Sequence, residues 1–272
     1  MIDEAVLQRT LHQALKGGGD FAEVFAEDRR LASARLDDAK IEELVSGRER
    51  GAGIRVVRGD TTGFAHTADL SEEGLRAAAE AAAAAAHGTP GESHVVALER
   101  REVNPTHPVQ VLPQSVEKVR KAEVLERADR PARAESDSIS QVSATYADSR
   151  RRVLIANSDG LLVEDDRVRT RFGVNCVAVG DTGMQTGMEA PGRTLGFEIF
   201  DEIDPEEVAR VAARRAVTML DARPAPRGKL PVVLKRGAGG VLFHEACGHG
   251  LEADLVEKDA SVFRGHVGDL VA

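Results

Sequence analysis

The chain has 272 residues, of which 42% are hydrophobic and only 3% aromatic, so its core must be built from aliphatic side chains and alanine. Its formal net charge of −9 argues against a nucleic-acid or anionic-membrane partner, because such partners attract basic surfaces. An acidic start that lacks the features of a secretory signal, two widely spaced cysteines and no long apolar run together predict a soluble, cytoplasmic protein.

Two short basic stretches, residues 150–152 and 167–171, stand out in this acidic chain, and aspartates flank both of them. Charged side chains often protect exposed strand edges from pairing with other chains. We therefore interpret both stretches as solvated strand edges and not as a nucleic-acid site.

The first third of the chain combines helical and strand-like patterns. Apolar residues at helical spacing predict a helix over residues 4–15, which the three glycines at 17–19 end. Ser71 begins a second helix, expected to run to His87, whose alanine tract suits close packing on a sheet. Between these helices, alternating residues and a tight turn at Gly59-Asp60 predict strands over residues 21–27, 31–36, 41–44 and 51–57.

A polar, proline-containing stretch from residue 89 to residue 113 indicates a long loop or linker. We place a domain boundary at its end, which predicts an N-terminal domain at 1–112 and a metallopeptidase-like region at 113–272. The second region begins with a charged helix over 115–128, and its expected strands are 139–147, 152–157, 161–168 and 174–179.

The remaining pattern is helical apart from one short apolar run. Asp204 and Pro205 are typical of a helix N-terminus, whereas residues 181–196 show no defined period. Residues 230–234 predict a buried strand that leads into a helix over 240–256. The chain is therefore expected to have an α/β fold of the α+β kind, with an N-terminal antiparallel sheet and helices, followed by the start of a β-rich domain that is truncated.

The stretch from His244 to His249 carries the chemistry of the sequence. Its two histidines and the adjacent Glu245 are the residue types of a catalytic zinc site, where imidazoles bind the ion and a carboxylate takes a proton from water. The histidines are five residues apart, which places them about 140° apart on an ideal helix. Both can reach one ion only if the helix widens through a π-type turn or ends between them, and Gly248 and Gly250 favour such a distortion.

The segment resembles the HExxxH signature of the TldD/PmbA peptidases. The similarity covers nearly the whole chain, because further landmarks of that family occur in the same order at residues 20–24, 53–56, 63–65, 69–71, 157–160 and 244–254. The resemblance implies a zinc metallopeptidase that hydrolyses short or unfolded peptides, with His244 and His249 as zinc ligands and Glu245 as the general base. It also implies pairing with a homologous TldE/PmbA-like subunit, in a heterodimer or a higher oligomer.

One feature of that family has no counterpart here. The resemblance implies a third ligand, a cysteine far downstream, whereas this chain ends soon after the motif. Cys247 lies between the two histidines and is expected to point away from the ion, and Cys176 is expected to be a small buried residue. Glu252, Asp254 and His266 are near enough in sequence to coordinate. We therefore expect a fragment of a catalytic lineage that is inactive alone; the alternative is a non-catalytic partner subunit.

Overall fold

The computed structural model describes residues 1–87, 92–103, 108–181 and 183–271. Part of the predicted linker lies outside these residues. The contacts divide the chain into two compact units, Met1–Ala222 and Arg223–Ala272. The first unit contains the sheet and its helices, and the second contains the histidine motif.

The first unit is built on one sheet with the order β3-β2-β1-β5-β6-β4, and both β7 and β8 pair with β6. All of these pairings are antiparallel except that of β4 with β6. The strands are β1 Phe21–Asp37, β2 Lys40–Arg58, β3 Thr61–Thr67, β4 Glu99–Arg101, β5 Ile139–Asn157, β6 Leu161–Gly180, β7 Gly183–Glu189 and β8 Gly192–Arg193.

Four of these strands are long, with 17 to 20 residues each. Each joins two runs that the sequence predicts as separate strands. The hairpin turns at Gly59-Asp60 and at residues 157–160 are confirmed, because β2 and β3 flank the first and β5 and β6 flank the second. Pairing of β1 with β5 places the strands on both sides of the predicted linker in one sheet.

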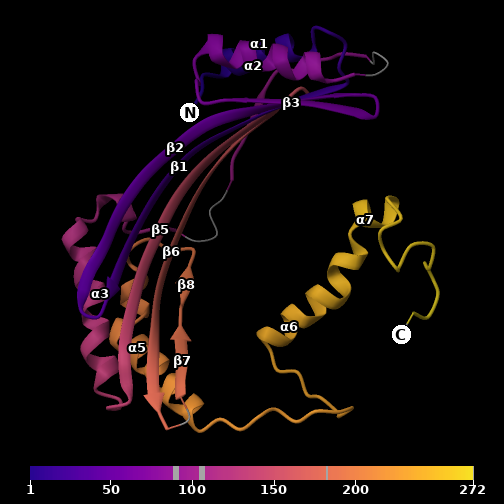
Figure 1. Ribbon diagram of the computed structural model, residues 1–272. Helices are drawn as coiled ribbons and strands as arrows, with labels where there is room; N and C mark the ends of the chain where they lie inside the picture. The colour runs from indigo at the N-terminus through magenta and orange to yellow at the C-terminus, as the bar shows by residue number, and fades with distance from the viewer. Residues whose placement is uncertain (88–91, 104–107, 182, 272) are drawn as a thin grey trace. The chain divides into compact units, whose positions relative to one another are not determined.

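Two pairs of helices cover the two ends of the long strands (Figure 1). Helices α1 Glu4–Leu15 and α2 Glu72–Ala85 contact one end, and α3 Lys118–Arg133 and α5 Pro205–Leu220 contact the other. Side-chain caps by Asp3, Ser71 and Asp204 begin three of them. A short 3-10 turn, Pro113–Ser115, precedes α3, and α4 Ile199–Glu202 precedes α5.

The hydrophobic core consists of two clusters, one beneath each pair of helices. Leu7, Leu11, Val24, Ile54 and Leu75 belong to the cluster beneath α1 and α2. The cluster beneath α3 and α5 contains Leu36, Leu125, Tyr146 and Phe172 among others. Cys176 lies in this second cluster, as expected of a small buried residue, and burial raises the pKa of its thiol to about 11.

Alanine-rich helices approach the sheet closely at two strand glycines. A Cβ atom on Gly63 would overlap the backbone of α2 at Ala82, and one on Gly187 would overlap the backbone of α5 at Ala212 and Ala216. The predicted close packing of the alanine tract is therefore confirmed for α2. Because backbone atoms cannot move aside without shifting the helix, side chains are excluded from both positions.

We expect Gly187→Ala to lower the free energy of unfolding by about 1–3 kcal/mol, the usual range for overpacking a core. Gly47→Ala is the matched control, since Gly47 also lies in a strand but has no other atom within 4 Å of the place that a Cβ atom would take. Urea denaturation followed by circular dichroism measures both. Equal stabilities of the two variants would contradict the packing argument.

The prediction that both basic stretches, residues 150–152 and 167–171, lie at strand edges is only partly correct. Residues 150–152 are not at an edge, because β5 pairs there with β1 on one side and with β6 on the other. In β6, residues 164–169 pair with β5, and no other described strand pairs with their second edge. The long strands thus carry their charged residues through the region between the two pairs of helices.

The second unit contains α6 Ala238–Phe243, a π turn at His244–Gly248, a 3-10 turn at His249–Leu251 and α7 Ala253–Glu257. The predicted buried strand at 230–234 is wrong for this structure: the segment forms no strand, and Val233 is 92% exposed. A strand needs neighbours to satisfy its backbone groups, and no described strand pairs with this segment. None of the described helices combines the length and apolar character that crossing a membrane requires.

Candidate metal centre

The predicted helix over residues 240–256 changes its winding at the histidine motif. Residues His244–Gly248 form a π turn, and the backbone N–H of His249 donates to the carbonyl of His244. This bond spans five residues, the spacing of the two histidines, so a wider turn takes the place of an α-helical one. The distortion predicted from the spacing is confirmed, and the helix is interrupted again at Glu252 before α7.

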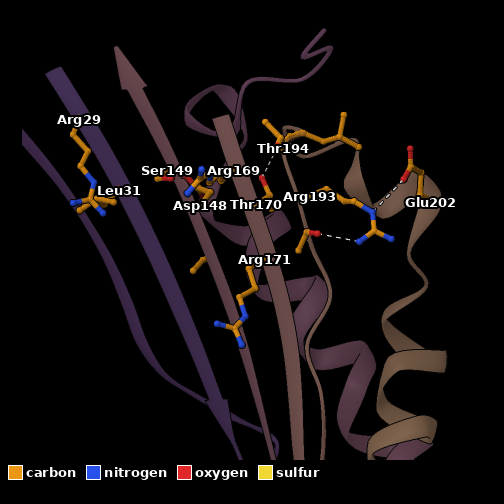
Figure 2. Close-up of a pocket in the computed structure, with 13 residues that line it drawn as sticks. Arg29, Leu31, Asp148, Ser149, Arg169, Thr170, Arg171, Arg193, Thr194 and Glu202 are labelled. Atoms are coloured by element: carbon orange, nitrogen blue, oxygen red, sulfur yellow. Dashed lines mark hydrogen bonds and ion pairs between the residues drawn. The ribbon is translucent and has the colours of Figure 1, made fainter. Parts of the chain in front are cut away.

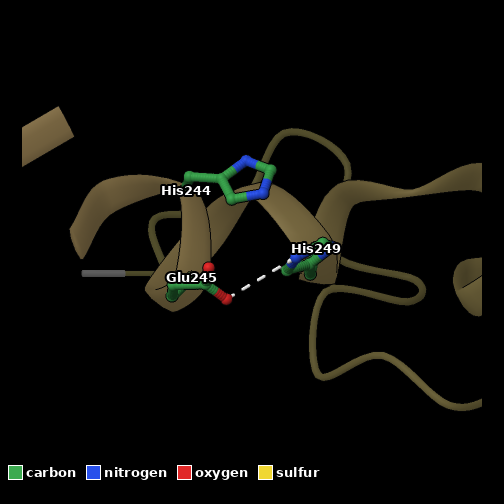
Figure 3. Close-up of side chains that lie close together, drawn as sticks. All are labelled: His244, Glu245 and His249. Atoms are coloured by element: carbon green, nitrogen blue, oxygen red, sulfur yellow. Dashed lines mark ion pairs between the residues drawn. The ribbon is translucent and has the colours of Figure 1, made fainter. Parts of the chain in front are cut away.

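The widened turn brings three side chains together (Figure 3). Ligand-type atoms of His244, Glu245 and His249 all lie within 4.8 Å of one another, and no other such group of three occurs among the described residues. The imidazole rings have their centroids 4.4 Å apart, and Glu245 Oε2 lies 3.6 Å from His249 Nε2. All three residues are exposed, so an ion from solvent can reach them.

Glu252, which the sequence offers as a possible metal ligand, binds the ring of His249 and does not join the cluster of three residues. Its Oε1 lies 2.7 Å from Nδ1 of His249, whereas Nε2 of the same ring faces Glu245. This hydrogen bond raises the pKa of His249. A carboxylate on one ring nitrogen favours the tautomer whose other nitrogen can bind a metal. The spacing of three residues on a helix was the signal for this pair, and sequence reasoning missed it.

The two glycines of the motif provide space and not an unusual backbone conformation. Gly248 has φ −58°, which any residue adopts in a helix, and a Cβ atom there would lie 3.3 Å from Nδ1 of His244. A Cβ atom on Gly250 would lie 2.7 Å from the ring of Phe263. The hydroxyl of Ser261 donates to the carbonyl of Gly250, which holds the following loop against the turn.

The other candidate ligands lie outside the cluster. Cys247, between the two histidines in sequence, is exposed and does not belong to the cluster. Asp254 pairs with Lys258 at 3.6 Å, and Nδ1 of His266 lies 3.0 Å from Asp269 Oδ2. The described residues therefore bring together two imidazoles and one carboxylate as a possible metal centre.

Family models match most of the chain. A model described as PmbA/TldA metallopeptidase domain 1 matches residues 22–86, the central domain of that family matches 112–220, and its C-terminal domain matches 227–272. The chain belongs to the PmbA/TldD metallopeptidase family. The third match includes the histidine motif, so the cluster lies in the region that this family assigns to its C-terminal domain.

Curated relatives agree with membership of the PmbA/TldD family. The chain is 33% identical over 259 residues to the "Metalloprotease TldD homolog" of Haemophilus influenzae, covering 93% of this chain and 54% of the relative. It is 32% identical to a "Metalloprotease" of Methanothermobacter thermautotrophicus, covering 93% of this chain and 55% of the relative. The chain thus spans about half the length of the curated relatives it matches.

Solved structures show the same fold at lower identity. TldE from Thermococcus kodakarensis aligns with a TM-score of 0.74 at 16% identity, covering 96% of this chain and 58% of that one. A protein of Thermotoga maritima aligns with a TM-score of 0.77 at 20% identity, covering 98% and 59%. These alignments support the mixed α/β fold with an antiparallel sheet that the sequence predicts.

Proposed function

We propose that this chain carries the metal-binding part of a zinc-dependent peptidase, with His244 and His249 as ligands and Glu245 as the general base. The observation that supports this most directly is the cluster of these three side chains on a π turn. The names of the relatives support a metalloprotease. The same names do not favour the alternative that the chain is a non-catalytic partner subunit.

The donor set fits zinc by its chemistry. Imidazole nitrogens and carboxylate oxygens are common zinc ligands, and catalytic zinc sites combine three protein ligands with an open position. The cluster offers two imidazoles on one face of the turn, and the hydrogen bond with Glu252 orients the second. When bound, zinc would lower the pKa of water and polarise a peptide carbonyl.

Glu245 is placed for proton transfer beside the two imidazoles. Its carboxylate is exposed and lies 3.6 Å from Nε2 of His249, so it can accept a proton from a water that attacks beside the imidazoles. It can then deliver that proton to the amine nitrogen that leaves when the peptide bond breaks. Glu252, already bonded to His249, is the less suitable base.

The substrate, the cellular location and the assembly of the protein are also proposed from the family resemblance. We propose short or unfolded peptides as substrates, a cytoplasmic location, and pairing with a homologous TldE/PmbA-like subunit. The proposal concerns a longer protein with the length of the curated relatives, of which this chain spans about half. In that protein the third zinc ligand is expected to be a cysteine beyond this chain.

The metal requirement tests this proposal. We expect treatment of the longer protein with a chelator to remove peptide hydrolysis and zinc together, and added zinc to restore both. Elemental analysis and a fluorogenic peptide assay measure the two quantities on the same sample. Hydrolysis that persists after the metal is gone, or that returns with magnesium but not with zinc, would count against a zinc peptidase.

A further inference from the structure

A groove lined by arginines lies on the sheet of the first unit, whereas the residues that the proposed function uses belong to the second unit. Its larger part, a cavity of about 880 Å³, is lined by residues that include Arg29, Arg169, Arg171 and Arg193. An adjoining cavity of about 250 Å³ shares Arg29 and Arg169 and adds Arg151 and Arg167. We call the two cavities together the arginine groove; Figure 2 shows its larger part.

The strand register explains why these side chains meet. Arg29 of β1 is opposite Arg151 of β5, which is opposite Arg167 of β6. Residues directly opposite one another share a face, as do residues two apart on one strand, so Arg169 and Arg171 share this face with them. Neighbouring strands lie about 4.8 Å apart and alternate residues about 7 Å apart, so guanidinium groups on these positions can contact one ligand.

Only half of these arginines have acidic partners. Arg151 pairs with Glu27, Arg167 with Asp165, and Arg193 with Glu202 at 3.9 Å. The side chains of Arg29, Arg169 and Arg171 make no hydrogen bond or ion pair with any residue that the structure describes. Asp148 also lines the larger cavity but is paired with Lys121, so six arginines and the three other acids leave a local excess of three positive charges in a chain whose formal charge is −9.

The ligand that this arrangement fits is a peptide carboxylate. Guanidinium groups bind carboxylates through paired, directional hydrogen bonds. A single-stranded nucleic acid would also supply anions, but proteins that bind one usually stack its bases on aromatic side chains, and the described lining of the groove contains none. The acids Glu27 and Glu202 at the groove also disfavour a continuous polyanion.

We propose that the arginine groove binds the carboxylates of an acidic peptide segment, with Arg29, Arg169 and Arg171 as its contacts. The choice of a peptide rests on the proposed function, because a peptidase must hold peptides. The groove would then give this protein a preference for peptides that carry aspartate or glutamate.

The test is peptide binding without cleavage. A fluorescein-labelled peptide rich in aspartate and glutamate, and its copy with asparagine and glutamine, are titrated with the Glu245→Gln protein in EDTA. We expect the acidic peptide to bind about tenfold or more tightly at low salt, a difference of about 1.4 kcal/mol, and the preference to shrink at high salt. Fluorescence anisotropy measures both affinities.

Substitutions identify the groove as the site. Arg169→Gln combined with Arg171→Gln should remove the preference, and Arg29→Gln alone should reduce it. Arg130→Gln is the matched control, because Arg130 lies on α3, away from the groove, and its side chain makes no ion pair with a described residue. Thermal unfolding by circular dichroism verifies that each variant folds, and Arg29→Gln serves as the independent variant if the double substitution does not.

Three outcomes would overturn the inference: equal affinity for the two peptides, a preference that survives the groove substitutions in folded protein, or tighter arginine-dependent binding of a single-stranded oligonucleotide. The binding assay needs neither metal nor hydrolysis. If the groove binds acidic peptides but the longer protein, with Glu245 and zinc in place, cleaves no peptide, the proposed function is contradicted and this inference stays intact.

Discussion

Glu245→Gln in the longer protein is expected to lower peptide hydrolysis by about 10²–10⁴-fold, the usual contribution of a general base, while bound zinc stays nearly unchanged. The amide keeps the size of the side chain but cannot accept the proton from water. Steady-state rates with a fluorogenic peptide and elemental analysis of zinc measure the two effects separately.

A matched control is available on the next helix. Glu257 is exposed on α7 and makes no ion pair with a described residue, so Glu257→Gln should alter neither rate nor zinc content. Loss of zinc on Glu245→Gln would place Glu245 among the ligands, which its 3.6 Å distance from His249 Nε2 also permits. A rate equal to that of the unaltered protein would remove Glu245 from the mechanism.

The second large effect concerns zinc binding by the 272-residue chain alone. Within the described cluster only His244 and His249 are proposed as ligands, because Glu245 is assigned as the general base, and zinc sites rarely have fewer than three protein ligands. We therefore expect weak binding that strengthens as pH rises, because imidazoles must lose their protons to bind, and no peptidase activity. Isothermal titration calorimetry with zinc, and the same peptide assay, check both statements.

Substitutions within the π turn sharpen this test. His249→Ala should weaken zinc binding by at least about 10–100-fold, since loss of a direct ligand costs no less than loss of the residue that orients it. Cys247→Ser is the control, because Cys247 is in the same turn but does not join the cluster. Stoichiometric zinc that survives dialysis and is lost on Cys247→Ser would show a local site with Cys247 as third ligand.

Much of the fold follows from local signals in the sequence. Asp3, Ser71 and Asp204 accept hydrogen bonds from the first turns of their helices, so α1, α2 and α5 begin where short polar side chains precede apolar periodicity. Glycine-containing turns place the hairpins after β2 and β5 because such turns depend on the backbone freedom of a few adjacent residues. The histidine motif likewise identifies itself by residue type and spacing.

Other features depend on neighbours that are distant in sequence. In the sequence, the charged middle segments of the long strands resemble loops between separate strands. Pairing with the adjacent strands nevertheless keeps these segments extended where no helix covers the sheet. Residues 230–234 show the converse, because an apolar run forms no strand without a strand to pair with. Helix α3 continues to Arg133 through Pro131, beyond its predicted end at residue 128, because Ala132 packs into the core there.

The sequence by itself determined the family resemblance, the starts of α1, α2 and α5, the hairpins and the three candidate site residues. Only the tertiary structure decided how His244 and His249 face one another, through a backbone bond across five residues, and that Glu252 supports His249. It also decided that arginines from β1, β5 and β6 share one face. Local signals act over a few residues, whereas these arrangements depend on backbone winding and strand register, which spacing alone does not fix.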